Sequence, residues 1–293
     1  MKIAVIGASG YIGKNLINRL LAETNHSVVA LSQTAESMSI QNERLAKFNV
    51  DIFDTKTLQK YLNDCEAVYY LIHMMAQKKL DFAEAESKAA ESFCAAAKGS
   101  KIQKVIYLGG LGSDSDKLSK HLASRHKTGE ILRNSLPQVI EFRASMVVGS
   151  GSISYDIVTN LIHKLPIMTL PKWSSTLTQP IGLNDALSYL IAALTLKTSE
   201  HQIIEIGGPD QLSYGDLMKR YAEWENKKML IVKFYVIPTT IAAWWLNLFT
   251  PKIHAKVGRI MVDSLSNSMI VTNDLASELF PDIKPQSLEA VFV

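Results

Sequence analysis

Short apolar runs alternate with segments of helical periodicity along most of the chain. The first run, residues 3–6, is rich in β-branched side chains, as in a buried parallel strand. Leu16, Ile17, Leu20 and Leu21 then recur at helical spacing. Further strands are expected at 27–31, 45–52, 67–73, 104–109, 138–145 and 203–206, and further helices at 56–63, 80–98, 118–134, 184–196 and 214–225. This alternation predicts an α/β fold, in which helices cover both faces of a doubly wound parallel sheet.

No change of composition marks a linker between two separate domains. We expect residues 1–150 to form a nucleotide-binding core of the Rossmann type. Residues 151–293 would supply the remaining elements of the sheet, interleaved with a smaller C-terminal lobe on the substrate side. Ligands of such sheets bind beyond the carboxyl ends of the strands, so the functional residues are sought there.

A glycine turn, G-x-x-G-x-x-G, links the first strand to the first helix. Its first glycine permits a tight turn, the second lets backbone N–H groups approach a pyrophosphate, and the third lets the helix pack against the strand. The helix N-terminus adds unpaired N–H donors and partial positive charge. A purely structural turn is the alternative, but the strand–turn–helix context favours a dinucleotide site. The expected cofactor contacts are Gly7, Ser9, Gly10, Tyr11, Ile12 and Gly13.

The second strand is followed by Ser32 and Gln33, where NAD sites usually carry an acidic residue for the ribose hydroxyls. Glu36 lies further along, and no arginine is at hand to pair a 2′-phosphate. Ser32 and Gln33 can serve either nucleotide, and Lys14 is a candidate for a phosphate contact. The missing carboxylate leads us to favour NADP(H) over NAD(H).

Other strand ends supply the rest of the expected cofactor site. Asp51 ends the third strand and can accept a hydrogen bond from the adenine amino group, or it is an exposed carboxylate without such a role. His73 ends the fourth strand, and it contacts the nicotinamide ribose or a phosphate unless it is a structural hydrogen bonder. These positions are Asp51, Ile52, Leu71, Ile72, His73 and Gly109 for the cofactor, with Gly110 next to the substrate.

Composition mainly excludes other classes of protein. The 293 residues carry a net charge of +3, and no basic stripe is interleaved with aromatics, so nucleic acid is not expected as a partner. Cys65 and Cys94 have no CxxC partner, and the seven histidines are scattered, so we expect reduced thiols and no metal site. The first strand begins at Lys2, which leaves no room for a signal peptide, and a cytoplasmic location is expected.

Residues 239–249 include the run IAAWWLNLF and are apolar nearly all round. The segment lies between Pro238 and Pro251 and is too short to span a bilayer. One interpretation is a buried helix or substrate lid, and the other is a weak contact with a membrane surface.

Several motifs resemble the extended and atypical branches of the short-chain dehydrogenase/reductase superfamily. They are GASGYIG at 7–13, YYLIHMM at 69–75, YLGGLG at 107–112, SKHLASRHKTGEIL at 119–132, FRASMVVGSG at 142–151, LPIMTLPKW at 165–173, TQPIGLNDAL at 178–187 and VTNDLASELFP at 271–281. More narrowly, the chain is similar to bacterial NAD(P)H-binding proteins described as nucleoside-diphosphate-sugar-epimerase-like, and to the reductase-like accessory subunit of respiratory complex I. The resemblance implies a Rossmann domain that binds NAD(P)(H), and homodimers are frequent in the superfamily.

The chain departs from this superfamily at the catalytic pair. Active members use Tyr-x-x-x-Lys, in which the phenol transfers the proton and the ammonium holds the ribose. Superposition of the motifs puts His121 and Arg125 at these positions, with His126 and Lys127 as alternatives, and 109–110 replaces the upstream Ser with glycines. His121 would donate a proton with a pKa near working pH, and Arg125 would bind the ribose. The alternative is that both are solvated helix residues of a protein without reductase chemistry.

Three residues are expected on the substrate side. Arg143, placed just after the sixth strand, pairs an anionic group of substrate or cofactor, or forms an internal salt bridge. Gln179 and Trp173 would line the pocket. Two functions follow. One is an oxidoreductase or epimerase-like enzyme acting on a small, partly apolar substrate. The other is a non-catalytic dinucleotide-binding sensor or assembly partner, which the missing tyrosine favours.

Overall fold

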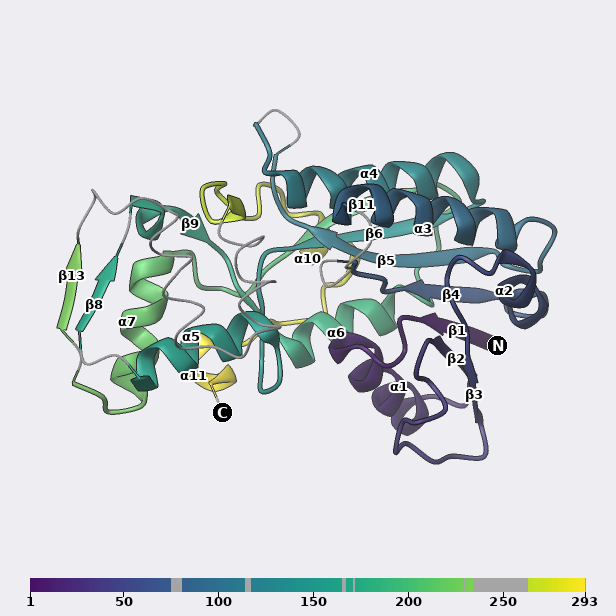
Figure 1. Cartoon of the computed structure of the whole chain (residues 1–293), viewed down its shortest axis with the longest axis horizontal. Coiled ribbons are helices and arrows are strands. Elements are labelled where there is room, and N and C mark those ends of the chain that lie inside the picture. Colours follow the sequence, from purple (N-terminus) through teal and green to yellow (C-terminus); the bar gives the residue numbers. More distant parts are fainter. Residues whose placement is uncertain are drawn as a thin grey trace.

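The computed structural model describes residues 1–74, 81–113, 117–164, 167–170, 172–228, 230–233 and 263–292. Its centre is a seven-stranded parallel sheet of order β11-β6-β5-β4-β1-β2-β3 (Figure 1). The strands are β1 (Lys2–Ile6), β2 (Ser27–Ser32), β3 (Leu45–Asn49), β4 (Ala67–Tyr70), β5 (Lys104–Gly110), β6 (Val139–Ala144) and β11 (Gln202–Ile206). The chain order reverses between β1 and β4, which is the switch point where ligands of such sheets bind.

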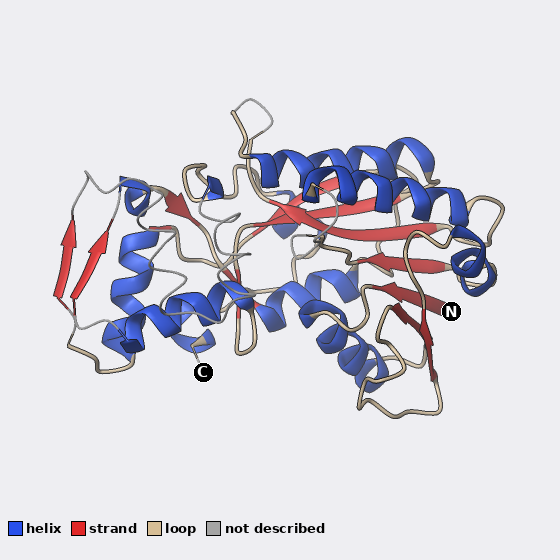
Figure 2. Cartoon of the chain, viewed as in Figure 1, coloured by secondary structure: helices blue, strands red, loops and turns tan. Residues whose placement is uncertain are grey.

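Helices cover both faces of this sheet, as the alternating pattern predicts (Figures 1 and 2). One face carries α2 (Thr55–Leu62), α3 (Phe82–Ala97) and α4 (Lys120–Ser135), which pack side by side. The other face carries α1 (Tyr11–Glu23) and α6 (Leu183–Ala192), which also pack together. The predicted Rossmann-type α/β fold is therefore confirmed.

Strand β4 shows why the sequences of the central strands are continuously apolar. Successive side chains of a strand point to opposite faces of the sheet. The hydroxyl of Tyr69 donates to the carbonyl of Leu190 on α6 at 3.0 Å. Tyr70 points the other way and stacks on Phe93 of α3, with ring centroids 5.1 Å apart. Both tyrosines are buried because both faces of the sheet are covered.

A second lobe lies beyond the carboxyl ends of the strands, at the left of Figure 1. Its elements are β7 (Val147–Val148), α5 (Ile153–Lys164), β8 (Ile167–Leu170), the 3-10 helix η1 (Lys172–Ser175), β9 (Leu177–Thr178), β10 (Ile181–Gly182), β12 (Leu212–Ser213), α7 (Tyr214–Trp224), β13 (Leu230–Lys233) and α11 (Leu288–Val291). Helix α10 (Leu275–Leu279) instead packs next to β11. The chain thus leaves the sheet after β6 and returns to it for α6 and β11. The division of the chain at residue 150 stays a prediction.

Two strands end earlier than their apolar runs suggest. β3 stops at Asn49, and Asp51 lies in a turn, where its carboxylate accepts from the N–H of Phe53 at 3.0 Å. β4 stops at Tyr70, so His73 belongs to the following loop. The turn after β3 forms because the local hydrogen bond to Asp51 competes with the strand ladder.

The apolar segment 239–249 lies outside the described residues. Within the described part of the chain, every helix is too short or too polar to cross a bilayer.

Candidate functional site

Two glycines of the loop between β1 and α1 are required by the packing of the chain itself. Gly7 has a φ of +85°, and a Cβ there would lie 2.7 Å from the carbonyl oxygen of Leu71. A Cβ on Gly13 would lie 2.4 Å from the carbonyl oxygen of Gly7. Gly7 therefore allows β1 and the loop after β4 to meet, and Gly13 allows α1 to approach β1.

Gly10 differs from both, because a Cβ there would have one neighbour at a longer distance. It is exposed, and a Cβ there would meet only the carbonyl oxygen of Gly7, at 3.1 Å. Gly10 is also the N-cap of α1, and no side chain caps this helix. Asp54, Asp81 and Ser119 do cap α2, α3 and α4. The first turn of α1 also lacks acidic residues, so its N–H groups suit an anion such as a diphosphate.

The end of β2 offers a free polar atom where a nucleotide ribose is expected. The hydroxyl of Ser32 is buried and has no hydrogen-bond partner among the described residues. Gln33 is exposed. Glu36 points elsewhere, since its carboxylate accepts from the amide of Asn49 at 2.9 Å. The adenine side therefore presents a neutral donor instead of a carboxylate.

The other expected cofactor contacts surround this loop. Asp51 is exposed, and Ile52 is buried in the turn that precedes α2. Ser9 and Ile12 are half-buried. The hydroxyl of Tyr11 is buried, has no partner among the described residues, and lies against the turn at Gly149. Burial is the main cause that raises the pKa of Tyr11 to about 12.

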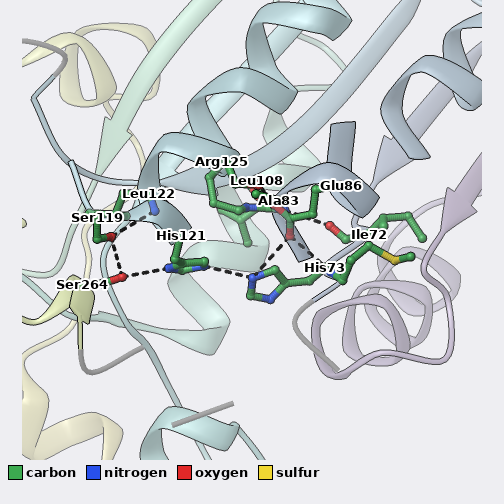
Figure 3. A network of polar contacts seen from close by, with 12 residues as sticks. Ile72, His73, Ala83, Glu86, Leu108, Ser119, His121, Leu122, Arg125 and Ser264 are labelled. Carbon is green, nitrogen blue, oxygen red and sulfur yellow. Dashed lines mark hydrogen bonds and ion pairs between the residues drawn. The ribbon is translucent and has the colours of Figure 1, made fainter. Parts of the chain in front are cut away.

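Beyond β4, two histidines face one another (Figure 3). Nε2 of His73 lies 3.0 Å from Nε2 of His121 on α4. Nδ1 of His121 lies 3.1 Å from the hydroxyl of Ser264, which lies 2.8 Å from the hydroxyl of Ser119. The N–H of Leu122 donates to Ser119 at 3.2 Å. These contacts form a chain of four polar side chains, which we call the histidine chain: His73, His121, Ser264 and Ser119.

A buried ion pair lies directly behind this chain. The carboxylate of Glu86 on α3 is 1% exposed and lies 3.4 Å from the guanidinium of Arg125 and 3.7 Å from Nε2 of His73. It also accepts from the hydroxyl of Ser124 at 2.5 Å and from the N–H of Met74 at 3.2 Å. Such contacts fix the position of the carboxylate, because a buried charge requires paired groups.

Arg125 is engaged by the protein and does not project into an open site. It is 6% exposed and donates to the carbonyl oxygens of Ile72 at 2.9 Å and Leu108 at 2.5 Å. Its guanidinium also lies over the ring of Tyr107, 4.8 Å from the centroid. This arrangement ties the loop after β4 to β5 and α4. The expectation that Arg125 is a solvated helix residue is wrong.

The two histidines are neutral at neutral pH. Burial, aided by the charge of Arg125, lowers the pKa of His121 to about 4. The pKa of His73 is also lowered well below its usual value, first by loss of solvent on the side of the ring where Nε2 faces His121 and Glu86, and then by the charge of Arg125 and by His121. The expected pKa of His121 near working pH is therefore wrong, and so is the interpretation of His121 as a solvated residue. If these rings transfer a proton, the neutral imidazole is the form that donates or accepts it.

The alternatives on α4 are placed elsewhere. His126 is buried, and its Nε2 lies 3.0 Å from the carbonyl oxygen of Gly110. Lys127 is exposed and pairs with Glu130. Gly110 and Gly109 end β5, and a Cβ on Gly110 would meet Leu122 at 2.8 Å.

The expected substrate-side residues are dispersed. Arg143 lies inside β6, 5% exposed, and its Nε donates to buried Glu141 at 2.8 Å, which is the internal salt bridge kept as the alternative. The amide of Gln179 donates to the carbonyl of Gly208 at 2.7 Å, and its oxygen accepts from the N–H of Val271 at 2.8 Å. Trp173 is half-buried in the second lobe, edge-on to Tyr214, and its buried N–H has no partner among the described residues.

Sequence reasoning missed Glu86 and Ser264. Glu86 carried a signal, since it lies four residues after Phe82 and three before Ala89, on the apolar stripe of its helix. A charge on a buried stripe indicates a paired, interior group. Ser264 carried none, because 143 positions separate it from His121. Across the described ranges, no cluster of three or more metal-ligating side chains occurs.

The comparisons with known proteins agree with this geometry. A family model described as NAD(P)H-binding matches residues 7–145. No curated protein matches the chain by sequence.

Several solved structures are similar over nearly the whole chain. A triphenylmethane reductase from Citrobacter sp., complexed with NADP(H), is 14% identical with a TM-score of 0.76, covering 100% of this chain and 99% of that one. A nucleoside-diphosphate-sugar epimerase from Staphylococcus aureus is 14% identical with a TM-score of 0.75, covering 99% and 98%. The UDP-glucuronic acid 4-epimerase from Bacillus cereus, complexed with UDP-glucuronic acid and NAD, is 19% identical with a TM-score of 0.74, covering 100% and 96%.

At these identities the structures show the shared fold, and the family match supplies the ligand class. Residues 7–145 are thus an NAD(P)H-binding domain, and the chain as a whole shares the fold of these epimerases and this reductase.

Proposed function

We propose that this protein is an NADP(H)-dependent oxidoreductase that transfers a hydride between the nicotinamide and a small, partly apolar carbonyl or alcohol. The diphosphate would lie over Gly10 at the start of α1, and the adenine ribose would lie at Ser32. The reacting end would then reach the loop after β4, because the carbonyl of Leu71 in that loop is in contact range of Gly7. His73 and His121 are the titratable groups at that end.

The open space above Gly10 carries the proposal. The packing of the chain explains Gly7 and Gly13, whereas nothing described fills the room in front of Gly10. Helix α6 also begins after a glycine without a capping side chain, but its first turn contains Asp185, whereas the first turn of α1 has no acidic residue and leaves its N–H groups available to an anion.

The test is Gly10→Ala. The added methyl group should weaken binding of NADPH at least about tenfold, because it occupies the place of a phosphate oxygen, while Tm changes little. Gly99→Ala is the inverse control. Gly99 has a φ of +80° and open surroundings away from the loop, so alanine there should lower Tm and leave NADPH affinity unchanged. Equal NADPH affinity of Gly10→Ala and the unmodified protein would contradict the proposed site.

The preference for NADP(H) rests on Ser32. Its unpartnered hydroxyl can donate to a 2′-phosphate. Ser32→Asp should invert the preference, since a carboxylate accepts from ribose hydroxyls and repels a phosphate. The measurement is the ratio of Kd for NADPH and NADH. Tighter binding of NADH by the unmodified protein would overturn this preference.

His121 occupies the place of the superfamily's tyrosine, and we assign proton transfer to it together with its neighbour His73. Arg125 cannot be a proton carrier, and its contacts with Ile72 and Leu108 make it a clamp for the loop that holds His73. Gly110 is buried against Leu122 and leaves no room for a substrate. The apolar lobe around Trp173 would select the partly apolar part of the substrate.

A second candidate is a non-catalytic NAD(P)H-binding sensor or assembly partner. The observation in its favour is Arg125, because the residue at the lysine position is held by backbone carbonyls and a buried carboxylate. A panel of aldehydes, ketones and quinones with NADPH separates the two candidates. Absence of turnover together with a rise of Tm on nucleotide addition supports the sensor.

A further inference from the structure

We propose that His73 and His121 form one proton-transfer unit, in which His73 exchanges the proton with the substrate and His121 passes it through Ser264 to Ser119. This inference rests on the proposed oxidoreductase function for its chemistry. It assigns a catalytic role to His73 and relay roles to His121 and Ser264, and no sequence motif indicated the role of Ser264.

The orientation of the two rings is the first step. A neutral imidazole has one N–H donor and one acceptor nitrogen. Nε2 of His73 faces Nε2 of His121, so one ring donates and the other accepts across 3.0 Å. Nδ1 of His121 is engaged by Ser264. Nδ1 of His73 therefore ends the chain, and among the described residues it has no hydrogen-bond partner; Figure 3 shows it on the edge of the ring facing away from Glu86.

The exposure of the chain fits an entry and an exit for a proton. The side chain of His73 is 40% exposed, and its loop touches the glycine loop through Leu71 and Gly7. At the other end Ser119 is partly exposed, whereas Ser264 between them is buried. A proton can therefore reach Ser119 from water and leave from His73 without water entering between them.

Hydrogen bonding allows two arrangements that differ by one shift along the chain. In the first, His73 carries its proton on Nδ1, and its Nε2 accepts a hydrogen bond from Nε2–H of His121. Nδ1 of His121 accepts from the hydroxyl of Ser264. The oxygen of Ser264 accepts in turn from the hydroxyl of Ser119. In the second, His73 carries its proton on Nε2, and each hydrogen bond runs the other way. Ser119 accepts from the N–H of Leu122 in both arrangements.

Reduction of a carbonyl converts the first arrangement into the second. The carbonyl carbon gains the hydride, which the reduced nicotinamide supplies, and its C=O π bond opens. The oxygen takes the proton from Nδ1 of His73. Nε2 of His73 then takes a proton from His121, His121 takes one from Ser264, Ser264 takes one from Ser119, and Ser119 takes one from water. Both rings end neutral, and oxidation of the alcohol runs the same steps backwards.

The charged neighbours favour neutral rings at rest. Arg125 faces both histidines from α4 and disfavours a second positive charge, while Glu86 faces His73 Nε2 from α3 at 3.7 Å. Glu86 would stabilise the partial positive charge that passes through His73 during transfer. A neutral imidazole as hydrogen-bond donor to a carbonyl is chemistry known from other enzymes.

The first test reads the rings directly, without turnover. Imidazole ¹⁵N shifts of the two histidines, assigned with His73→Gln and His121→Gln, should show neutral rings at pH 7. His121→Gln should change the tautomer of His73, because it replaces the donor at Nε2. His26→Gln, at the other edge of the sheet, should leave both spectra unchanged. Two rings that titrate independently near pH 6.5, each unaffected by the other's substitution, would overturn the unit.

The second test uses NADPH oxidation with the carbonyl that turns over best. His73→Gln should lower kcat roughly 100-fold, the usual size of a lost proton donor, and leave the Kd of NADPH unchanged. Ser264→Ala should lower kcat less, by about tenfold, and alter the solvent isotope effect, while Ser266→Ala, two residues away with its exposed hydroxyl bonded to Asp263, should do neither. An unchanged kcat in His73→Gln would refute the catalytic role.

The results of these tests distinguish failure of the proposed oxidoreductase function from failure of the proton-transfer unit. Nucleotide binding without turnover of any carbonyl refutes the oxidoreductase and, with it, the catalytic role of His73. Turnover that survives His73→Gln refutes only the unit proposed here. The ¹⁵N spectra decide in either case whether the two rings share their protons.

Discussion

The glycine loop and the histidine chain lie at the same edge of the sheet, yet they are built in opposite ways. At the glycine loop, backbone N–H groups of α1 and the hydroxyls of Ser32 and Tyr11 are left without side-chain partners among the described residues. Directly behind the histidine chain, Arg125 and Glu86 each make hydrogen bonds with several protein groups. The donors without protein partners at the glycine loop are available to a ligand. The side chains at and behind the histidine chain are instead held in place by hydrogen bonds with one another.

From this contrast we predict that the buried carboxylate of Glu86, which pairs with Arg125 behind the histidine chain, strongly stabilises the fold. Glu86→Gln should lower the free energy of unfolding by about 3 kcal/mol, because it leaves the guanidinium of Arg125 without its counter-charge. Glu84→Gln on the same helix is the control, since Glu84 is exposed and pairs with the exposed Lys88. Its expected effect is below about 0.5 kcal/mol. Urea denaturation of the two variants measures both, and similar values would contradict the contrast.

Within the glycine loop, Gly13→Ala sharpens the comparison between packing and ligand binding. The new Cβ would meet backbone oxygens of Gly7 and Ala8, at 2.4 and 2.9 Å, which cannot move aside independently. We expect a loss of about 2 kcal/mol in the free energy of unfolding, typical of overpacking. Gly10→Ala should lose far less in the same urea titration. If both alanines destabilised equally, Gly10 would be a packing glycine as well.

The pH dependence of stability tests the buried histidines. In the unfolded chain an imidazole takes up a proton near pH 6.5, but His121 in the fold does so only near pH 4. The unfolded state therefore binds more protons in this window, and stability is lost as the pH falls. The expected slope from His121 is up to about 1.4 kcal/mol per pH unit, and His73 adds in the same direction. Urea denaturation between pH 4 and 6.5 measures the slope, which His121→Gln should reduce. An unchanged slope in this variant would contradict the lowered pKa of His121.

The smallest expected effects come from two buried tyrosine hydroxyls. Tyr11→Phe removes a hydroxyl without a partner among the described residues, so stability should stay equal or rise slightly. Tyr107→Phe removes a hydroxyl that donates to the carbonyl of Arg125 at 2.9 Å, so we expect a loss of about 1 kcal/mol. Thermal unfolding compares the pair. A clear loss of stability in Tyr11→Phe would show that its hydroxyl is not free.

Most of the sheet could be predicted from the chain because its signals are local. The apolar runs of β1 and β4 and the periodicity of α1 arise from neighbouring residues, and burial on both faces leaves little choice of pattern. Strand ends were less accurate, as at β3, because the aspartate turns that stop a strand compete with its ladder through single hydrogen bonds.

In the candidate site, too, the residues with a local sequence signal could be predicted, and the contacts between distant residues could not. The glycines of the cofactor loop could be named from spacing alone, since their function depends on the backbone that the same residues form. His121 and Arg125 could be named from their positions on one helix, but their environment could not. The contact of His121 with Ser264 joins residues 143 positions apart, and the pairing of Arg125 with Glu86 joins two helices.

The sequence by itself determined the parallel sheet, its helical layers and the dinucleotide loop, because each is encoded in periodicity and short spacing. Only the tertiary structure decided that Arg125 is a buried clamp, that the two histidines are neutral, and that His73 is the exposed end of a hydrogen-bonded chain. Charge states and hydrogen-bond partners depend on burial and on groups brought together from distant segments, and those properties exist only once the chain is folded.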